Sequence, residues 1–293
     1  MKSLCQEYLL THSVEEALHI LSTAKGPARL ISGGSDLLLE IRQGEHPPVH
    51  TLVDVSEISE MCQLEIRGET LFIGASVTLT RLANSTLVAE HARALAQAAS
   101  LMGNPQVCNV ATIGGNVAHA LPAADGAIAL LSLDAQAEIA NAEGRRKVAL
   151  QTLFKAPRHS TLDPCGELLV GFYLPLQKRG QTSAFTRRTN PQGIPLAILN
   201  LSVWLQRSKD RITDVRIAVG PAGPVPMRMK KAENAFIGRV PSDDNLARGL
   251  DELLQGAHFR TSPHRATAGY RRYLAGILLK EAISQAWLRA ETR

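Results

Sequence analysis

Apolar and polar positions in the first part of the chain predict a small β-α-β unit. One helix face is indicated by apolar residues with helical spacing at Val14, Ala17, Leu18 and Leu21. Ser13 and Glu16 form a capping box at its start, and the residues before Ser13 are expected to lead straight into this helix. A strand at 28–31, a helix at 37–43 capped by Ser35 and a strand at 51–55 complete the unit.

A second unit is predicted from residue 71 onward, where strand-like and helical patterns alternate. The expected elements are a strand at 71–75, helices at 87–102 and 127–133, a hairpin of 136–140 with 147–150, and a strand at 168–174. In the third region, strands at 198–206 and 212–219 precede three helices. The last helix, 267–289, is expected to bury one face that includes Tyr270 and Tyr273.

Two glycine-rich turns, about eighty residues apart, interrupt these patterns: Ser32-Gly33-Gly34-Ser35-Asp36 and Ala111-Thr112-Ile113-Gly114-Gly115-Asn116. Each is interpreted as the end of an apolar strand running into a tight polar turn. Glycine permits a positive φ and lets backbone N–H groups approach a ligand, so a Cβ at Gly114 would block that approach. Two such turns are suited to hold one pyrophosphate from both sides, which favours a dinucleotide cofactor. Two purely structural turns are the alternative.

The charge distribution adds a boundary that the apolar pattern does not show. Residues 1–176 contain 12 Lys and Arg against 18 Asp and Glu, whereas residues 177–293 contain 20 against 9. The basic part is interpreted as a solvated face or as a surface for a cofactor phosphate, an acidic partner or a nucleotide acceptor. Nucleic acid is disfavoured, because only 4% of residues are aromatic and no nucleic-acid-binding motif is present.

Several other functions are disfavoured by what the chain lacks. The four cysteines at positions 5, 62, 108 and 165 form no CxxC pair and are expected to be reduced thiols, so no metal site is predicted. No apolar run approaches the ~20 residues of a membrane span and no signal peptide is visible, which favours the cytoplasm. No catalytic triad, HExxH or Walker motif is present, so no catalytic residue is assigned and the chemistry is expected to belong to a cofactor.

Five stretches of the sequence resemble those of one known family. They are ARLISGGSDL at 28–37, PQVCNVATIGGNVAHALPAAD at 105–125, LDAQAEI, GELLVGFYLP and the terminal YRRYLAGILLKEAI. In this order they resemble the FAD-binding medium subunit of the xanthine dehydrogenase and carbon monoxide dehydrogenase family of molybdenum hydroxylases. The resemblance covers almost the whole chain, and the stretch at 105–125 is its most specific part.

The resemblance implies an α+β fold in several parts. An FAD-binding domain at 1–176, of the PCMH type, would consist of two α/β subdomains at about 1–56 and 57–176. A C-terminal domain at 177–293, of the CO dehydrogenase flavoprotein type, would contain a small antiparallel sheet and helices. The charge boundary near residue 176 agrees with this division.

The resemblance also implies the FAD contacts. These are Arg29, Leu30, Ile31, Ser32, Gly33, Gly34, Ser35, Asp36, Ala111, Thr112, Ile113, Gly114, Gly115, Asn116, Asp125, Leu168 and Thr186. The two turns would hold the pyrophosphate mainly through backbone N–H groups, whereas Asp36 and Asp125 also suit ordinary positions at helix starts. The chain departs from the family pattern at Cys108, at Leu121-Pro122 and at Thr186, where a lysine is common. His119 and Cys108 are expected to be ordinary loop and packing residues.

By resemblance, the chain is an oxidoreductase flavoprotein subunit. It would take electrons from [2Fe–2S] centres of a small subunit, which serve a molybdopterin-binding large subunit, and pass them to an acceptor such as NAD, a quinone, oxygen or a protein carrier. One alternative is a degenerate nucleotide-binding or assembly module that no longer turns over flavin. Another is a free-standing FAD oxidoreductase on the same fold.

Overall fold

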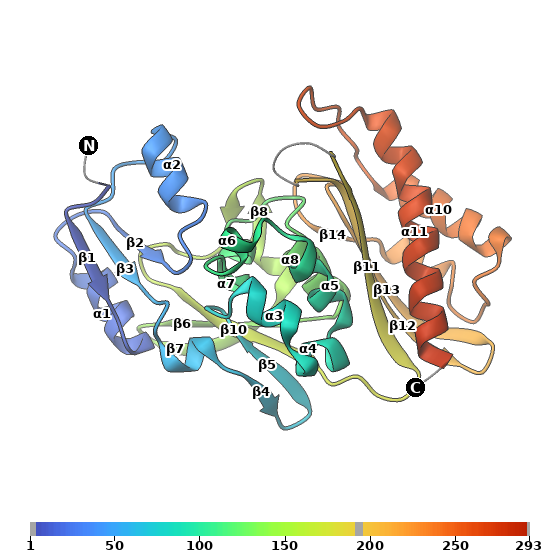
Figure 1. Cartoon of the computed structure of the whole chain (residues 1–293), viewed down its shortest axis with the longest axis horizontal. Helices are drawn as coiled ribbons and strands as arrows, with labels where there is room; N and C mark the ends of the chain where they lie inside the picture. The colour runs from blue at the N-terminus through green and yellow to red at the C-terminus, as the bar shows by residue number, and fades with distance from the viewer. Residues whose placement is uncertain (1–3, 191–195, 292–293) are drawn as a thin grey trace.

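The computed structural model describes residues 4–190 and 196–291, which form three larger sheets and one two-stranded sheet, with helices packed around them (Figure 1). The first sheet is parallel, in the order β1-β3-β2, with β1 (Glu7–Leu10), β2 (Ala28–Ile31) and β3 (Thr51–Asp54). Helix α1 (Val14–Thr23) joins β1 to β2, and α2 (Leu37–Gln43) follows β2. This small unit lies at the N-terminal end of the molecule, at the left of Figure 1.

Two expectations for this unit are wrong. The residues before α1 do not lead straight into it but form β1, whose four residues are all exposed and therefore show no alternation of buried and exposed positions. Ser35 does not cap α2: the capping position is Asp36, and its side chain makes no capping hydrogen bond. Ser13 does cap α1, where its hydroxyl accepts a hydrogen bond from the Glu16 amide.

The second unit contains an antiparallel sheet in the order β4-β5-β10-β6-β7. Its strands are β4 (Leu64–Arg67), β5 (Thr70–Gly74), β6 (Gln136–Asn141), β7 (Gly144–Ala149) and β10 (Leu168–Pro175), after the short helix η1 (Ser59–Cys62). Between β5 and β6 lie helices α3 (Leu79–Asn84), α4 (Thr86–His91), α5 (Arg93–Leu101), α6 (Pro105–Cys108), α7 (Ile113–Ala118) and α8 (Asp125–Ser132). Between β7 and β10 are η2 (Leu150–Leu153) and the hairpin of β8 (Phe154–Ala156) with β9 (His159–Ser160).

The helix expected at 87–102 is divided into two. The backbone leaves the helical conformation at Ala92, with φ −141° and ψ 48°, between α4 and α5. The amide of Ala94, in the first turn of α5, donates to the Ser183 hydroxyl at 3.0 Å. Ser183, about ninety positions away in the sequence, therefore supplies the acceptor for an amide at the start of α5. Helix propensities of the residues near Ala92 do not predict this contact, so the sequence does not predict the break.

The C-terminal part is an antiparallel sheet in the order β11-β12-β13-β14 with three helices that pack on the sheet or on one another. The strands are β11 (Gln181–Thr189), β12 (Ala197–Ser208), β13 (Arg211–Gly220) and β14 (Met227–Arg228), and the helices are α9 (Lys230–Asn234), α10 (Asp243–Gly256) and α11 (Ala268–Glu291). The two strands and three helices expected here are confirmed, and β11 was not predicted. Tyr270 and Tyr273 are 47% and 66% exposed, so their expected burial is wrong; Arg271 lies on the buried face instead.

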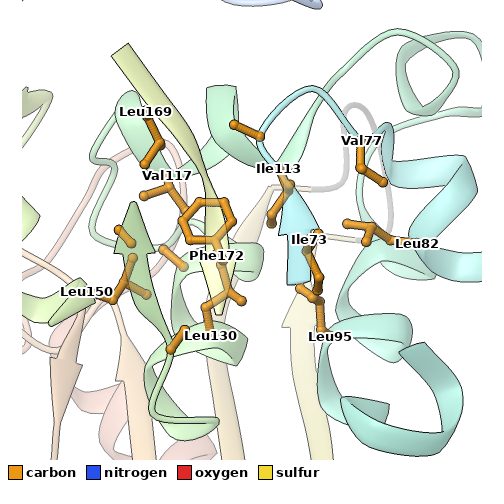
Figure 2. Close-up of a cluster of buried hydrophobic side chains, with 14 of the residues drawn as sticks. Ile73, Val77, Leu82, Leu95, Ile113, Val117, Leu130, Leu150, Leu169 and Phe172 are labelled. Carbon is orange, nitrogen blue, oxygen red and sulfur yellow. The ribbon is translucent and has the colours of Figure 1, made fainter. Parts of the chain in front are cut away.

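One large hydrophobic core fills the second unit and extends beyond it (Figure 2). Side chains of the sheet, such as Ile73 and Phe172, pack there against helix residues such as Leu95 and Leu130. Three residues of the C-terminal sheet also belong to this core: Phe185, Trp204 and Ala218. The C-terminal sheet has a second core of its own beneath α11. The two parts of the chain are thus joined by shared apolar packing.

Candidate functional site

A cavity lies where the first parallel sheet meets the second unit. It contains about 780 Å³ of space free of protein atoms, its open mouth included. The residues expected at the site that line it are Arg29, Leu30, Ile31, Ser32, Thr112, Gly114, Gly115 and Leu168. Segments from three distant parts of the sequence therefore border one space. Most of the wall is apolar, with a few polar groups, as is usual for a cofactor site.

The two glycine turns meet at this cavity. A Cβ on Gly33 would lie 2.1 Å from the Val110 carbonyl oxygen, so only glycine allows the first turn to approach the segment before the second one. Gly34, with φ +65°, has the left-handed conformation that favours glycine. The first turn is also held by the Ser32 hydroxyl, which donates to Ser76 Oγ at 3.2 Å.

The first turn leaves backbone donors free. The amides of Gly33, Gly34 and Ser35 have no hydrogen-bond acceptor among the residues that the structure describes. They follow the carboxyl end of β2 and precede α2, a position that favours an anionic group. This turn therefore supplies the N–H donors that a phosphate group requires.

The second turn has a different structure from the one expected. It follows helix α6 and a short loop, where a strand was expected, and Gly114 and Gly115 are helical residues of α7. Thr112 caps this helix by accepting from the Gly115 amide at 3.2 Å. The amide of Gly114 donates to the Ala75 carbonyl at 2.8 Å. The amides of Ile113, Gly114, Gly115 and Asn116 are thus already engaged within the protein.

The two neighbouring glycines of α7 have different surroundings. Gly114 is buried, and a Cβ there would lie 2.6 Å from the Ala75 Cβ and 2.7 Å from its carbonyl oxygen. Gly115 is exposed on the cavity wall, and a Cβ there would meet only the Thr112 hydroxyl, at 3.3 Å. Gly114 is therefore required by packing within the protein, whereas Gly115 leaves space for whatever occupies the cavity.

Arg29 is the cationic side chain of the cavity wall. Its guanidinium donates to the Ala28 carbonyl at 2.9 Å and makes no ion pair with any carboxylate in the described part of the chain. Glu167 lines the same wall but is paired with Arg146 at 2.7 Å. Burial acts to raise the pKa of Glu167, but Arg146 and the Asp163 amide outweigh it and keep that pKa below its ordinary value. The wall thus has one cation available for an anionic ligand.

Asp125 and Thr186 do not line the cavity. Asp125, at the start of α8, is buried, and its carboxylate accepts from Arg187 and from Asn200, each at 2.5 Å. Burial raises the pKa of Asp125, and the two partners oppose that rise. The Thr186 hydroxyl donates to the Leu278 carbonyl at 3.2 Å. In this structure both side chains have partners within the protein, and those of Asp125 connect helix α8 to β11 and β12.

The other expected site residues lie near the cavity without lining it: Gly33, Gly34, Ser35, Asp36, Ala111, Ile113 and Asn116. Ile113 belongs to the core, and Asn116 Oδ1 accepts from the Ala127 amide at 3.3 Å, which connects α7 to α8. The sequence reasoning missed Ala75 and Ser76, which line the cavity just after β5. Their position at the end of an apolar strand, in Gly-Ala-Ser, was the available signal.

His119 and Cys108 have packing and hydrogen-bonding roles. His119 Nε2 lies 3.6 Å from Glu40 of α2, and the same carboxylate contacts Arg158, between β8 and β9. The Cys108 thiol donates to the Met102 carbonyl at 2.6 Å, and burial raises its pKa, so it is a neutral packed thiol. Within the described residues, no group of three His, Cys, Asp or Glu is placed to hold a metal ion. No helix in that same part of the chain is long and apolar enough to cross a membrane.

Comparison with known proteins identifies the class. Residues 4–177 match the profile of the FAD binding domain in molybdopterin dehydrogenase, and residues 189–286 match that of the CO dehydrogenase flavoprotein C-terminal domain. The first match covers more than half of the chain, so this protein belongs to the family of FAD-binding flavoproteins of molybdenum hydroxylases. The resemblance seen in the sequence and its α+β fold are confirmed, and FAD is the cofactor of the domain.

Named relatives cover nearly the whole chain. The 6-hydroxypseudooxynicotine dehydrogenase complex subunit alpha of Paenarthrobacter nicotinovorans is 29% identical over 99% of this chain and 97% of its own. The xanthine dehydrogenase FAD-binding subunit of Escherichia coli O157:H7 is 28% identical over 94% and 93%. A solved structure of carbon monoxide dehydrogenase from Hydrogenophaga pseudoflava superposes with a TM-score of 0.92, at 27% identity, over 99% of both chains.

Proposed function

We propose that this chain is the electron-transfer flavoprotein subunit of a multi-subunit molybdenum hydroxylase. It would receive electrons from [2Fe–2S] centres of a small subunit and deliver them to an external acceptor such as NAD, while a molybdopterin-binding large subunit acts on the organic substrate. The observation that carries the proposal is the cavity where both glycine segments meet. The named relatives, which are subunits of complexes of this kind, support the partner arrangement.

The residues of the cavity fit FAD. The free amides at Gly33, Gly34 and Ser35, together with the unpaired Arg29, would hold the pyrophosphate. Gly115 would allow the cofactor to approach α7 closely, and the apolar wall that includes Leu168 would exclude water from its ring. Bound FAD supplies chemistry that stores two electrons and exchanges them one or two at a time. The protein would contribute binding, orientation and access.

The domain boundaries of this proposal are those expected from charge. We assign 1–176 to FAD binding, with subdomains of about 1–56 and 57–176, and 177–293 to the C-terminal domain. The first parallel sheet ends at Asp54 and the second sheet ends at Pro175, which supports this division. We also propose a cytoplasmic location, supported by four free cysteines, with no pair of them forming a disulfide in the described residues.

The test begins with the visible spectrum of the purified chain and chromatography of the nucleotide released by heat. Stoichiometric FAD with a flavin spectrum is expected. A colourless protein that does not bind added FAD would overturn the proposal and favour a degenerate assembly module. Copurification from the native host then tests the partners: isolation of the chain without a molybdenum-containing and an iron–sulfur subunit would favour a free-standing flavoprotein. Stopped-flow reoxidation of the complex by NAD, a quinone or oxygen identifies the acceptor.

A further inference from the structure

A buried cation lies in the C-terminal part, on α11. The buried face of this helix is apolar at Leu274, Ala275, Leu278 and Leu279. The first buried residue of the helix, however, is Arg271. Only 2% of Arg271 is exposed, and it is the largest fully buried side chain of the described chain. A long, charged side chain at an apolar position must be explained by a partner, because burying an unpaired charge is costly.

The part of the chain that the structure describes supplies no such partner. Arg271 Nε and Nη1 are both buried, and neither has a hydrogen-bond acceptor in residues 4–190 or 196–291. The group also makes no ion pair with an Asp or Glu of those residues. A guanidinium is a rigid fork of donors that suits the oxygens of a phosphate or carboxylate. The two buried donors therefore lack the acceptor that an oxyanion would supply.

The surroundings of Arg271 are positively charged. Burial and the nearby charges of Arg265 and Arg260 lower the pKa of the Arg271 guanidinium, and no acidic group opposes them. Like charges gathered without a counter-charge repel one another, so the cluster is stabilised only when an anion neutralises it. Three cations and no carboxylate match the charge of a phosphate better than that of a single carboxylate.

The first turn of α11 provides a further donor for an anion. Thr261 accepts from the Ala268 amide and Thr267 accepts from the Tyr270 amide, each at 3.1 Å, and the Arg271 amide donates to the Thr267 carbonyl. In the described structure, Gly269 is the residue of this turn whose amide has no acceptor, and a Cβ there would meet nothing within 4 Å. A free N–H at a helix N-terminus favours an anion.

We propose that Arg271, with Arg265, Arg260 and the start of α11, forms a binding site for a phosphate group, separate from the residues that line the FAD cavity. The site uses the positive charge of residues 177–293, which the cavity leaves unexplained. The phosphate would come either from inorganic phosphate or from a nucleotide. This inference does not depend on the proposed electron acceptor.

The test measures binding of inorganic phosphate and of ADP to the FAD-loaded protein in a phosphate-free buffer. Titration calorimetry should show one phosphate per chain, and phosphate at ten times its dissociation constant should raise the unfolding midpoint by about 3 °C. Arg271→Met should lose both effects. Arg272→Met is the matched control, because Arg272 is its exposed neighbour on the same helix, and it should retain both.

Removing a buried unpaired cation should not prevent folding, so Arg271→Met is expected to be at least as stable as the wild type without phosphate. If ADP saturates the site at a concentration at least tenfold lower than inorganic phosphate does, the natural ligand is a nucleotide. If ADP binds as weakly as inorganic phosphate or more weakly, the natural ligand is inorganic phosphate. Either result supports the site. Absence of saturable wild-type binding up to about 20 mM phosphate would overturn it, whatever the variants do. Equal phosphate binding by wild type and Arg271→Met would also overturn it.

Discussion

Alanine substitutions at the two adjacent glycines of α7 should separate cofactor binding from protein packing. Gly115→Ala adds a methyl group that meets only the Thr112 hydroxyl, at 3.3 Å, and otherwise extends into the cavity. Gly114→Ala adds one at 2.6 Å from the Ala75 Cβ, far inside the 3.5–4.0 Å of ordinary carbon contacts. One change therefore affects the ligand and the other affects the protein itself.

The magnitudes follow from these distances. Replacing a helical glycine with alanine stabilises a helix by about 0.5–1 kcal/mol, so Gly115→Ala should leave the apoprotein equally or slightly more stable. A methyl group in space that FAD needs should cost about 1–3 kcal/mol of binding, or roughly a 5- to 150-fold loss of affinity. Gly114→Ala should instead destabilise the apoprotein by about 1–3 kcal/mol, because Ala75 must move.

The assay measures both quantities for both variants. Urea unfolding of the apoprotein gives the free energy of unfolding, and titration with FAD, followed by the change in flavin fluorescence, gives the dissociation constant. Wild-type affinity in Gly115→Ala would refute the assignment of this wall to the cofactor. An unchanged unfolding free energy in Gly114→Ala would refute the packing argument.

Three further outcomes are expected. Arg29→Met should weaken FAD binding by about 1.5–3 kcal/mol, roughly 10- to 150-fold, through loss of a charged hydrogen bond, and equal affinity in wild type and variant would contradict this. Arg187→Met should lower the urea-unfolding free energy by about 3–5 kcal/mol, because it leaves the buried Asp125 carboxylate without its cation; a loss below about 1 kcal/mol would show that the pair is dispensable. Burial and the hydrogen bond to Asp54 raise the pKa of Tyr8 to about 12, so its contribution to stability is complete below pH 10 and is lost as pH rises toward 12. Tyr8→Phe should reduce that alkaline loss in unfolding measured from pH 9 to 12, and an identical pH profile in the variant would be the contrary result.

The sequence predicts most of the elements whose signals are local. The Ser13 cap of α1, the strand at 28–31 before the first glycine turn and the hairpin of β6 and β7 depend on neighbouring residues, and the structure contains all three. The other half of the expected capping box differs, because the Glu16 carboxylate accepts from the His12 amide instead of the Ser13 amide. Strand β1 could not be predicted in this way, because it is short, has no buried position and exists through pairing with β3.

The site shows the same limit. Segment 29–32 and Gly115 border the cavity, as expected from the two glycine turns in the sequence. The sequence does not show, however, that Gly114 is required by packing whereas Gly115 faces the cavity. That difference depends on Ala75, about forty residues earlier. Asp125 is expected from the sequence to contact the cofactor, and the structure adds two partners from the C-terminal sheet, Arg187 and Asn200. Long-range packing decides both roles, and spacing along the chain does not contain it.

The shared core has a consequence for biosynthesis. Phe185, Trp204 and Ala218 complete the core of the FAD-binding part, although they follow its last strand in the chain. A nascent chain that has left the ribosome only as far as Pro175 lacks these side chains and leaves apolar surface of α5 and α8 uncovered. Cofactor insertion should therefore follow release of β13, and a fragment ending near residue 177 should depend on chaperones to stay monomeric.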